Sequence, residues 1–276
     1  MITEGRENYR VFINVGSSAC PARCTYCYVP PGRSQPFPDA AIRSGLESLC
    51  AQASFRAGRE GTILTFGGHT DLFLDRALAA AFLRVLPLAT AWGNPIQLST
   101  KGLISHEDAD AIAAATYAGQ ITAFIACATT ARAAEFEPSA PTPERRWANF
   151  STLASRGIAS GLLIKPWLGE ATARSLSTFA EVLCEHRVRA ACLGGIFISD
   201  AIRARIGFLP EGRHAPGERH PFGLEMDSAI QPPKEQFDTL QHLAPDTLLF
   251  GSSLCVTAMF ARRKCPLHPG GECSAR

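Results

Sequence analysis

CPARCTYC, at residues 20–27, places three cysteines, Cys20, Cys24 and Cys27, within one short loop, with Tyr26 directly before the last of them. Three thiolates that converge from one loop can hold three irons of a four-iron cluster, whereas an ordinary electron-transfer cluster takes four cysteines. The fourth iron then has no protein ligand, and an open metal position is what a catalytic site needs and a structural site avoids. The spacing therefore predicts a [4Fe–4S] cluster that can bind a further molecule.

This spacing, C-x3-C-x-aromatic-C, resembles the cysteine motif of the radical S-adenosylmethionine (SAM) enzymes. The resemblance implies that the unique iron binds the amino and carboxylate groups of SAM, and that an electron from the reduced cluster cleaves SAM. The resulting 5′-deoxyadenosyl radical would abstract a hydrogen atom from a substrate, and a flavodoxin- or ferredoxin-type partner would donate the electron. The alternative is a structural zinc site, which needs a fourth ligand, and no histidine lies near the loop in the sequence.

Length and composition fit one soluble domain. The chain has 276 residues, within reach of a single α/β barrel, and 46% of them are hydrophobic. A formal net charge of +2 gives no indication of the basic face that nucleic-acid-binding proteins carry. No apolar run is long enough for a membrane helix and the first residues are polar, so we expect a cytoplasmic protein. Ten cysteines in such a protein indicate metal or catalytic use rather than disulfides.

Short β-rich runs alternate with amphipathic helical segments along most of the chain. The runs predict strands at residues 11–15, 62–66, 96–101, 121–126, 161–166 and 190–198. The segments after them predict helices at residues 39–53, 74–88, 105–115, 142–155 and 171–185. Strict alternation predicts a parallel sheet with helices outside it. We therefore expect an α/β fold, a partial (β/α)6 TIM-type barrel, with its functional residues at the carboxyl ends of the strands.

After residue 200 the alternation loosens. We expect residues 1–200 to form the barrel and residues 201–276 to form a short C-terminal extension. Residues 208–222 are rich in Pro, Gly, His and Arg, which predicts a long, lid-like loop. A helix at residues 231–243, a short strand at residues 247–250 and a cysteine-containing tail are expected to follow.

Four further stretches resemble the spore photoproduct lyase-like branch of the radical SAM enzymes. They are GGHTD at residues 67–71, STK at 99–101, EPSAPTPERR at 137–146 and IKP at 164–166. In true spore photoproduct lyases, the resemblance places a cysteine at the turn after the second strand, where it returns a hydrogen atom to the product radical. Gly68 or His69 stands there in this chain, and neither donates hydrogen as a thiol does. We therefore do not expect repair of thymine dimers in DNA.

The turn after the second strand and the end of the third strand supply the expected SAM-binding residues. Lys101 suits an ion pair with the SAM carboxylate, and Ser99 can support it from the same strand. Glycines in the turn leave the backbone open to the methionine amino group, and Tyr26 is expected to pack near the adenine. The alternatives are a plain strand-ending turn, a core aromatic and a lysine exposed at the rim. The predicted set is Tyr26, Gly67, Gly68, Thr70, Asp71, Ser99 and Lys101.

Two residues are candidates for the catalytic step, Cys127 and His69. Cys127 ends the fourth predicted strand near the rim and could donate hydrogen, although a free cysteine often only fills core space. His69 could bind SAM or substrate, or make a structural hydrogen bond. Lys165 is a weaker candidate, because alternation along the fifth strand can point it to either face.

Three cysteines lie close together in the tail: Cys255, Cys265 and Cys273. They could hold an auxiliary iron–sulfur cluster, for which a fourth ligand is missing, or a zinc ion together with His268. They could also face the substrate as free thiols, or be incidental. Three more cysteines, on predicted helices and a strand, are expected to be structural: Cys50, Cys184 and Cys192.

The sequence thus predicts a radical SAM enzyme that acts on a small molecule or a peptide. Two alternatives stay open. A radical SAM enzyme of nucleic-acid repair or modification would need a basic groove, and the chain has few clustered Lys or Arg residues. A zinc-binding α/β protein without catalytic activity would hold zinc in place of iron.

Overall fold

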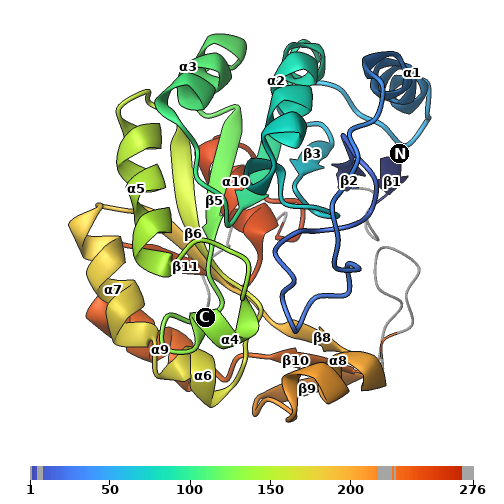
Figure 1. Cartoon of the computed structure of the whole chain (residues 1–276). Coiled ribbons are helices and arrows are strands. Elements are labelled where there is room, and N and C mark those ends of the chain that lie inside the picture. Colours follow the sequence, from blue (N-terminus) through green and yellow to red (C-terminus); the bar gives the residue numbers. More distant parts are fainter. Residues whose placement is uncertain (1, 5–8, 217–225, 227, 269–276) are drawn as a thin grey trace.

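The computed structural model describes residues 2–4, 9–216, 226 and 228–268, and its centre is an eight-stranded sheet (Figure 1). The strand order is β1-β2-β3-β4-β5-β6-β7-β11. β1 is antiparallel to β2, and all the other neighbours are parallel. The strands are β1 (Ile2–Glu4), β2 (Arg10–Ile13), β3 (Ile63–Phe66), β4 (Ile96–Thr100), β5 (Ile121–Ala126), β6 (Ala159–Ile164), β7 (Ala190–Leu193) and β11 (Leu248–Phe250). The α/β class and the partial barrel are confirmed.

Helices connect successive parallel strands and cover the outer face of the sheet (Figure 1). The longer ones are α1 (Asp39–Cys50), α2 (Arg76–Thr90), α3 (His106–Ala115), α5 (Pro143–Ala154) and α7 (Leu176–Glu185). Three short helical segments lie between them: η1 (Leu72–Leu74), α4 (Ala133–Phe136) and α6 (Glu170–Ala173). Side chains alternate along the strands, so that Ile125 of β5 faces the large outer core while Phe124 faces the inside of the barrel.

Helix α10 (Ser253–Phe260) fills the inner side of the sheet. It contacts β5, β6, β7 and β11. Cys255 and Val256 of this helix pack with Phe124, Cys192 and Phe250 of the strands in a second, smaller core. Residues 253–260 (SLCVTAMF) carry no charge, and a helix that is apolar on all sides belongs in a core.

Strand β11 extends the parallel sheet beyond the six predicted strands. It pairs with β7, with Leu249 opposite Ala191. The strand predicted at residues 247–250 is therefore present, and it lies in the wall of the barrel. Residues after 200 thus contribute both a strand to the sheet and the helix that fills its inner side.

The predicted sixth strand, residues 190–198, is wrong in its extent because it is two strands. Gly194 and Gly195 separate β7 from β8 (Ile196–Ile198), which belongs to a three-stranded antiparallel sheet in the order β8-β10-β9. A Cβ on Gly195 would lie 2.4 Å from the carbonyl oxygen of Ile230, so this close approach of two strands requires glycine.

The lid-like loop predicted at residues 208–222 contains a strand, β9 (Arg213–Pro216), and its residues 217–222 lie outside the described residues. The helix predicted at residues 231–243 begins later, as α9 (Lys234–Leu243), because Gln231 ends β10 (Ser228–Gln231) and two prolines follow it. Helix α8 (Asp200–Ile206) lies between β8 and β9. None of the described helices is long and apolar enough to cross a membrane.

Candidate active site

A cavity of about 140 Å³ opens at the carboxyl ends of the strands, and the cysteine loop forms one of its walls. The turn after β3, the end of β4 and the ends of β5 and β6 form the others. All three loop cysteines and all seven predicted SAM-binding residues line it. The lining also includes Lys165, which directly follows β6. The full set of predicted residues in the lining is Cys20, Cys24, Tyr26, Cys27, Gly67, Gly68, Thr70, Asp71, Ser99, Lys101 and Lys165.

Hydrogen bonds hold the cysteine loop from two sides. The backbone N–H of Thr25 donates to the carbonyl of Phe136, at 3.0 Å, in the segment between β5 and α5. From the other side, Arg205 of α8 donates to the carbonyls of Thr25, at 2.9 Å, and of Cys27, at 2.5 Å. Arg23 turns the loop with a left-handed backbone, φ 53°. The positions of the thiols therefore depend on two distant parts of the chain.

A buried charged network fixes Tyr26. Its hydroxyl donates to Glu137, at 2.5 Å, and the other carboxylate oxygen of Glu137 accepts from Arg146. Both side chains of this ion pair are almost fully buried, and Arg146 also donates to the carbonyl of Ala126, at 2.9 Å, at the end of β5. Sequence reasoning missed this pair, although both residues lie in the EPSAPTPERR stretch. It ties the loop to β5 and α5.

Asp71 connects the turn after β3 to the end of β4 through hydrogen bonds. Its carboxylate accepts hydrogen bonds from the Thr100 hydroxyl and from the backbone N–H of Lys101, each at 2.5 Å, and from the N–H of Phe73, at 3.2 Å. The carboxylate of Asp71 is buried and accepts three hydrogen bonds from the protein, so that its oxygens are bonded within the protein and not to a ligand. Asp71 therefore positions Lys101.

Lys101 places its ammonium group 5.7 Å from the centre of the Tyr26 ring, beside the cysteine loop. Burial acts to lower the pKa of Lys101, but the charges of Cys24 in its ionised form, of Glu137 and of Asp71 outweigh it and raise that pKa. Lys101 therefore keeps its positive charge in the cavity, and this charge can bind an anionic group. Near it, the buried hydroxyl of Thr70 has no hydrogen-bond partner among the described residues.

The three loop thiols are half-buried, and burial raises the pKa of each of them, that of Cys24 to about 12. They hold their protons at neutral pH when no metal is bound, and binding a metal releases those protons. In the described part of the chain, no three His, Cys, Asp or Glu side chains are arranged to hold one metal ion. A [4Fe–4S] cluster does not need such an arrangement, because each thiolate binds a different iron. The donor set therefore fits a cluster.

The whole architecture is similar to that of solved radical SAM enzymes. A variant of spore photoproduct lyase superposes with a TM-score of 0.63 at 15% identity, over 86% of this chain and 75% of that chain. Spore photoproduct lyase complexed with dinucleoside spore photoproduct gives 0.60 at 15% identity, over 87% and 75%. The chain has the radical SAM fold.

A third radical SAM structure is the methyltransferase TsrM from Kitasatospora setae, with tryptophan and a SAM analogue bound. Its TM-score is 0.60 at 13% identity, over 93% of this chain but only 58% of that chain. The sequence itself matches no family model and no curated protein. The similarity thus lies in the fold, and the chemistry has to be argued from the residues of this chain.

Within this radical SAM fold, the glycines of the GGHTD turn are required by packing. A Cβ on Gly67, where φ is +83°, would lie 2.3 Å from the carbonyl oxygen of Ser99, and a Cβ on Gly68 would lie 2.7 Å from the Phe12 ring. The turn therefore packs tightly against β4 and β2. The carbonyl of Gly68 accepts a hydrogen bond from the Tyr28 hydroxyl, at 3.1 Å.

The two residues predicted for the catalytic step do not line the cavity. The His69 ring lies against Asn14 and Ser18, with its Nδ1 2.9 Å from the Asn14 amide nitrogen, and burial lowers the pKa of His69 to about 4. This placement agrees with the structural alternative for His69. Cys127 is fully buried in the outer core, and its Sγ lies 3.3 Å from the carbonyl of Thr129. That placement agrees with a cysteine that fills core space.

Two of the tail cysteines, Cys255 and Cys265, lie in the inner core, away from the cavity. The Sγ atoms of Cys255 and Cys265 are 3.5 Å apart, and both residues are buried. Cys273 lies outside the described residues. Of the cysteines predicted to be structural, Cys192 is buried in the inner core, whereas Cys50 and Cys184 are exposed.

Proposed function

We propose that this chain is a radical SAM enzyme, in which a [4Fe–4S] cluster bound to Cys20, Cys24 and Cys27 supplies the electron that cleaves SAM to a 5′-deoxyadenosyl radical. The observation that carries the proposal is the common cavity of the three thiols and the fixed cation Lys101, at the carboxyl ends of the strands of a radical SAM fold. The radical would take a hydrogen atom from a small molecule or a peptide.

Each residue of the cavity has a defined task in this proposal. Lys101 binds the carboxylate of SAM, and Asp71 holds Lys101 in place through its backbone N–H. The hydroxyl of Thr70 is available to a polar group of the ligand. Tyr26, held by Glu137, presents its ring beside Lys101 and limits the access of water to the cavity wall.

The substrate class follows from charge and from the turn after β3. The formal net charge of +2 and the lack of a thiol in the GGHTD turn distinguish this chain from an enzyme that repairs thymine dimers. Among the fold neighbours, spore photoproduct lyase has been solved with a dinucleoside and TsrM with tryptophan. We favour the second kind of substrate, an amino acid, peptide or similar small molecule, with a flavodoxin- or ferredoxin-type electron donor.

The first experiment measures iron and acid-labile sulfide per chain after anaerobic reconstitution. We expect about four irons in the wild type and about none in a Cys20→Ala/Cys24→Ala/Cys27→Ala variant. A Cys50→Ala/Cys184→Ala variant, which removes two exposed thiols, is the matched control and should keep about four irons. With dithionite and SAM, only the proteins that hold the cluster should form 5′-deoxyadenosine.

Two results would contradict the proposal. An iron content that the triple substitution leaves unchanged would place the cluster elsewhere, with the tail cysteines as its first candidates; a fall from about eight irons to about four would instead indicate an auxiliary cluster in the tail. Zinc in both proteins and iron in neither would make the chain a zinc-binding protein.

A further inference from the structure

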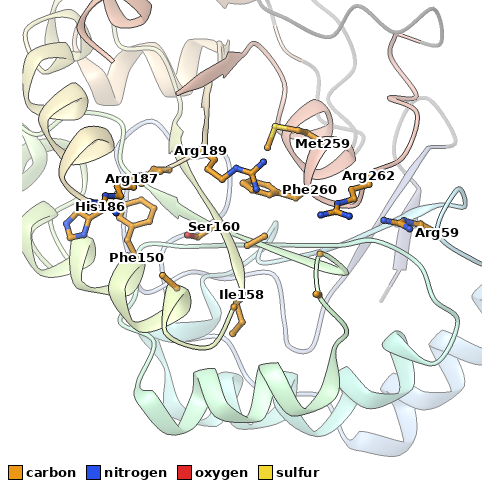
Figure 2. A pocket seen from close by; sticks show the side chains of 16 residues that line it. Arg59, Phe150, Ile158, Ser160, His186, Arg187, Arg189, Met259, Phe260 and Arg262 are labelled. Atoms are coloured by element: carbon orange, nitrogen blue, oxygen red, sulfur yellow. The ribbon is translucent and has the colours of Figure 1, made fainter. Parts of the chain in front are cut away.

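A second and larger cavity, of about 490 Å³, opens at the amino ends of β5, β6 and β7, at the opposite end of these strands from the cysteine loop (Figure 2). The carboxyl ends of helices α5, α7 and α10 surround it. Its lining contains five basic side chains and no Asp or Glu. They are Arg59, Arg187, Arg189, Arg262 and His186.

The four arginines of this cavity have no acidic partners in the part of the chain that the structure describes. Several arginines elsewhere on the surface are paired, as in Arg84 with Asp39 and Arg156 with Asp110. In the second cavity, Arg59 instead donates to a backbone carbonyl and Arg189 lies over an aromatic ring, 5.8 Å from its centre. The positive charge is therefore concentrated and uncompensated by carboxylates.

The helix ends do not cancel this charge. Each carboxyl end of a helix carries roughly half a negative charge, so α5, α7 and α10 together supply about −1.5 against four guanidinium groups, and about +2.5 is left over. The one direct contact of this kind among the described residues is the bond from Arg59 to the carbonyl of Ala261 at the end of α10, at 2.5 Å.

Two of the arginines hold an unfavourable backbone conformation. Arg187 and Arg262 follow α7 and α10 with φ of +50° and +51°, at the position where helices usually end in glycine. Gly157, with φ +67°, takes the corresponding place after α5, beside the same cavity. A side chain in this conformation is strained. The chain thus keeps two guanidinium groups at positions where glycine would be more stable.

We propose that this cavity binds a small molecule that carries two or more phosphate groups. One guanidinium group can bind two oxygens of a phosphate at once. Four guanidinium groups around one cavity can therefore bind more than one phosphate. The volume is in the range of small-molecule sites. The rings of Phe260 and His186, which are both partly exposed, offer flat surfaces to an attached organic group (Figure 2). The proposal does not depend on the radical chemistry, since the two cavities lie at opposite ends of the strands.

The test is isothermal titration of the reconstituted protein with inorganic pyrophosphate and with adenosine diphosphate. The critical variant is Arg187→Gly/Arg262→Gly, which removes two charges and relieves two strained backbones, so that the fold is expected to persist. The matched control is Arg174→Ala/Arg203→Ala, which removes two charges from exposed ion pairs outside the lining. We expect pyrophosphate to bind the wild type and the control alike, and to bind the glycine variant at least about tenfold more weakly. Formation of 5′-deoxyadenosine should be the same in all three proteins.

Three results would overturn the proposal. The wild type could fail to bind either probe. Both variants could weaken binding equally, which would indicate attraction by net charge without a site. A single-stranded oligonucleotide could bind more tightly than pyrophosphate and depend on the same two arginines, which would make this face a nucleic-acid surface.

Discussion

The two cavities lie at opposite ends of the same strands and differ in whether carboxylates accompany their basic side chains. At the carboxyl ends, Lys101 lies among Asp71, Glu137 and the cysteine thiols in about 140 Å³. At the amino ends, four arginines line about 490 Å³ without a carboxylate. Carboxylates near Lys101 fix its position for the single anionic group that we propose it binds, whereas arginines without carboxylates can bind several anionic groups. Volume alone would have pointed away from the end at which we propose the radical chemistry.

The largest effect is expected from Glu137→Gln, because it leaves Arg146 charged and buried without its partner. Breaking such a pair costs about 3–5 kcal/mol, to be measured as the free energy of unfolding in urea. The control is Glu135→Gln, which breaks the exposed pair with Arg132 two residues away and should cost about 0–1 kcal/mol. Similar losses of stability in both variants would contradict the prediction that the buried pair of Glu137 and Arg146 stabilises the fold more than the exposed pair does.

The thiols of the metal-free protein should show the next largest effect. With the pKa of Cys24 raised to about 12, the rate of its alkylation by iodoacetamide should rise about tenfold per pH unit from pH 7 to 10, without levelling off. The exposed Cys184 is the internal control, and peptide mass spectrometry separates the two sites. A plateau for Cys24 below pH 9 would contradict the burial of this thiol. Because the pKa is higher in the folded protein than in the unfolded chain, the metal-free fold should also lose stability from about pH 8.5 upward.

Lys101→Ala should weaken the binding of SAM to the reconstituted enzyme by roughly tenfold to a hundredfold, because it removes a charge-assisted hydrogen bond. Equilibrium dialysis measures this directly. Lys165→Ala, which removes the other lysine of the same cavity, is the control and should have the smaller effect. An equal loss in both variants would assign the carboxylate of SAM to neither lysine in particular.

The smallest effect concerns the strained arginine after α10. Arg262→Gly should stabilise the protein by about 1 kcal/mol, and Gly157→Ala, at the corresponding place after α5, should destabilise it by a similar amount. A Cβ on Gly157 would contact nothing within 4 Å, so that this variant reports backbone strain alone. A loss of stability in Arg262→Gly would mean that the guanidinium group serves the fold itself.

The sequence predicted the parts of the fold that depend on local patterns. Buried β-rich runs and capped helices are encoded within a few residues, and the helix predicted at residues 105–115 has such a cap, made by Ser105 and Asp108. The break at Gly194 and Gly195 was missed, because two glycines between apolar residues can lie within a strand or end it. The role of α10 was missed too, although its lack of any charged residue was a readable signal of burial.

In the candidate site, too, the sequence predicted what local patterns determine and missed what tertiary contacts determine. The three thiols of the cysteine motif line one cavity, and eight consecutive residues are enough to bring them together. His69 and Cys127 were placed at the rim by their distance from a strand end, but the direction of a side chain in a turn depends on its neighbours. The pair of Glu137 and Arg146 could not be expected, since charged residues are seldom buried and their partners are set by tertiary contacts.

Helix α10 also determines when the fold can be completed. β5, β6 and β7 precede it in the chain, yet the inner side of these strands is covered only once residues 253–260 have been added. During synthesis, the strands of the barrel therefore leave the ribosome before the helix that packs against their inner side. Until that helix follows, apolar side chains such as Phe124 are exposed to water. A chain interrupted before residue 253 would expose that surface permanently, as an aggregation-prone patch on otherwise finished strands.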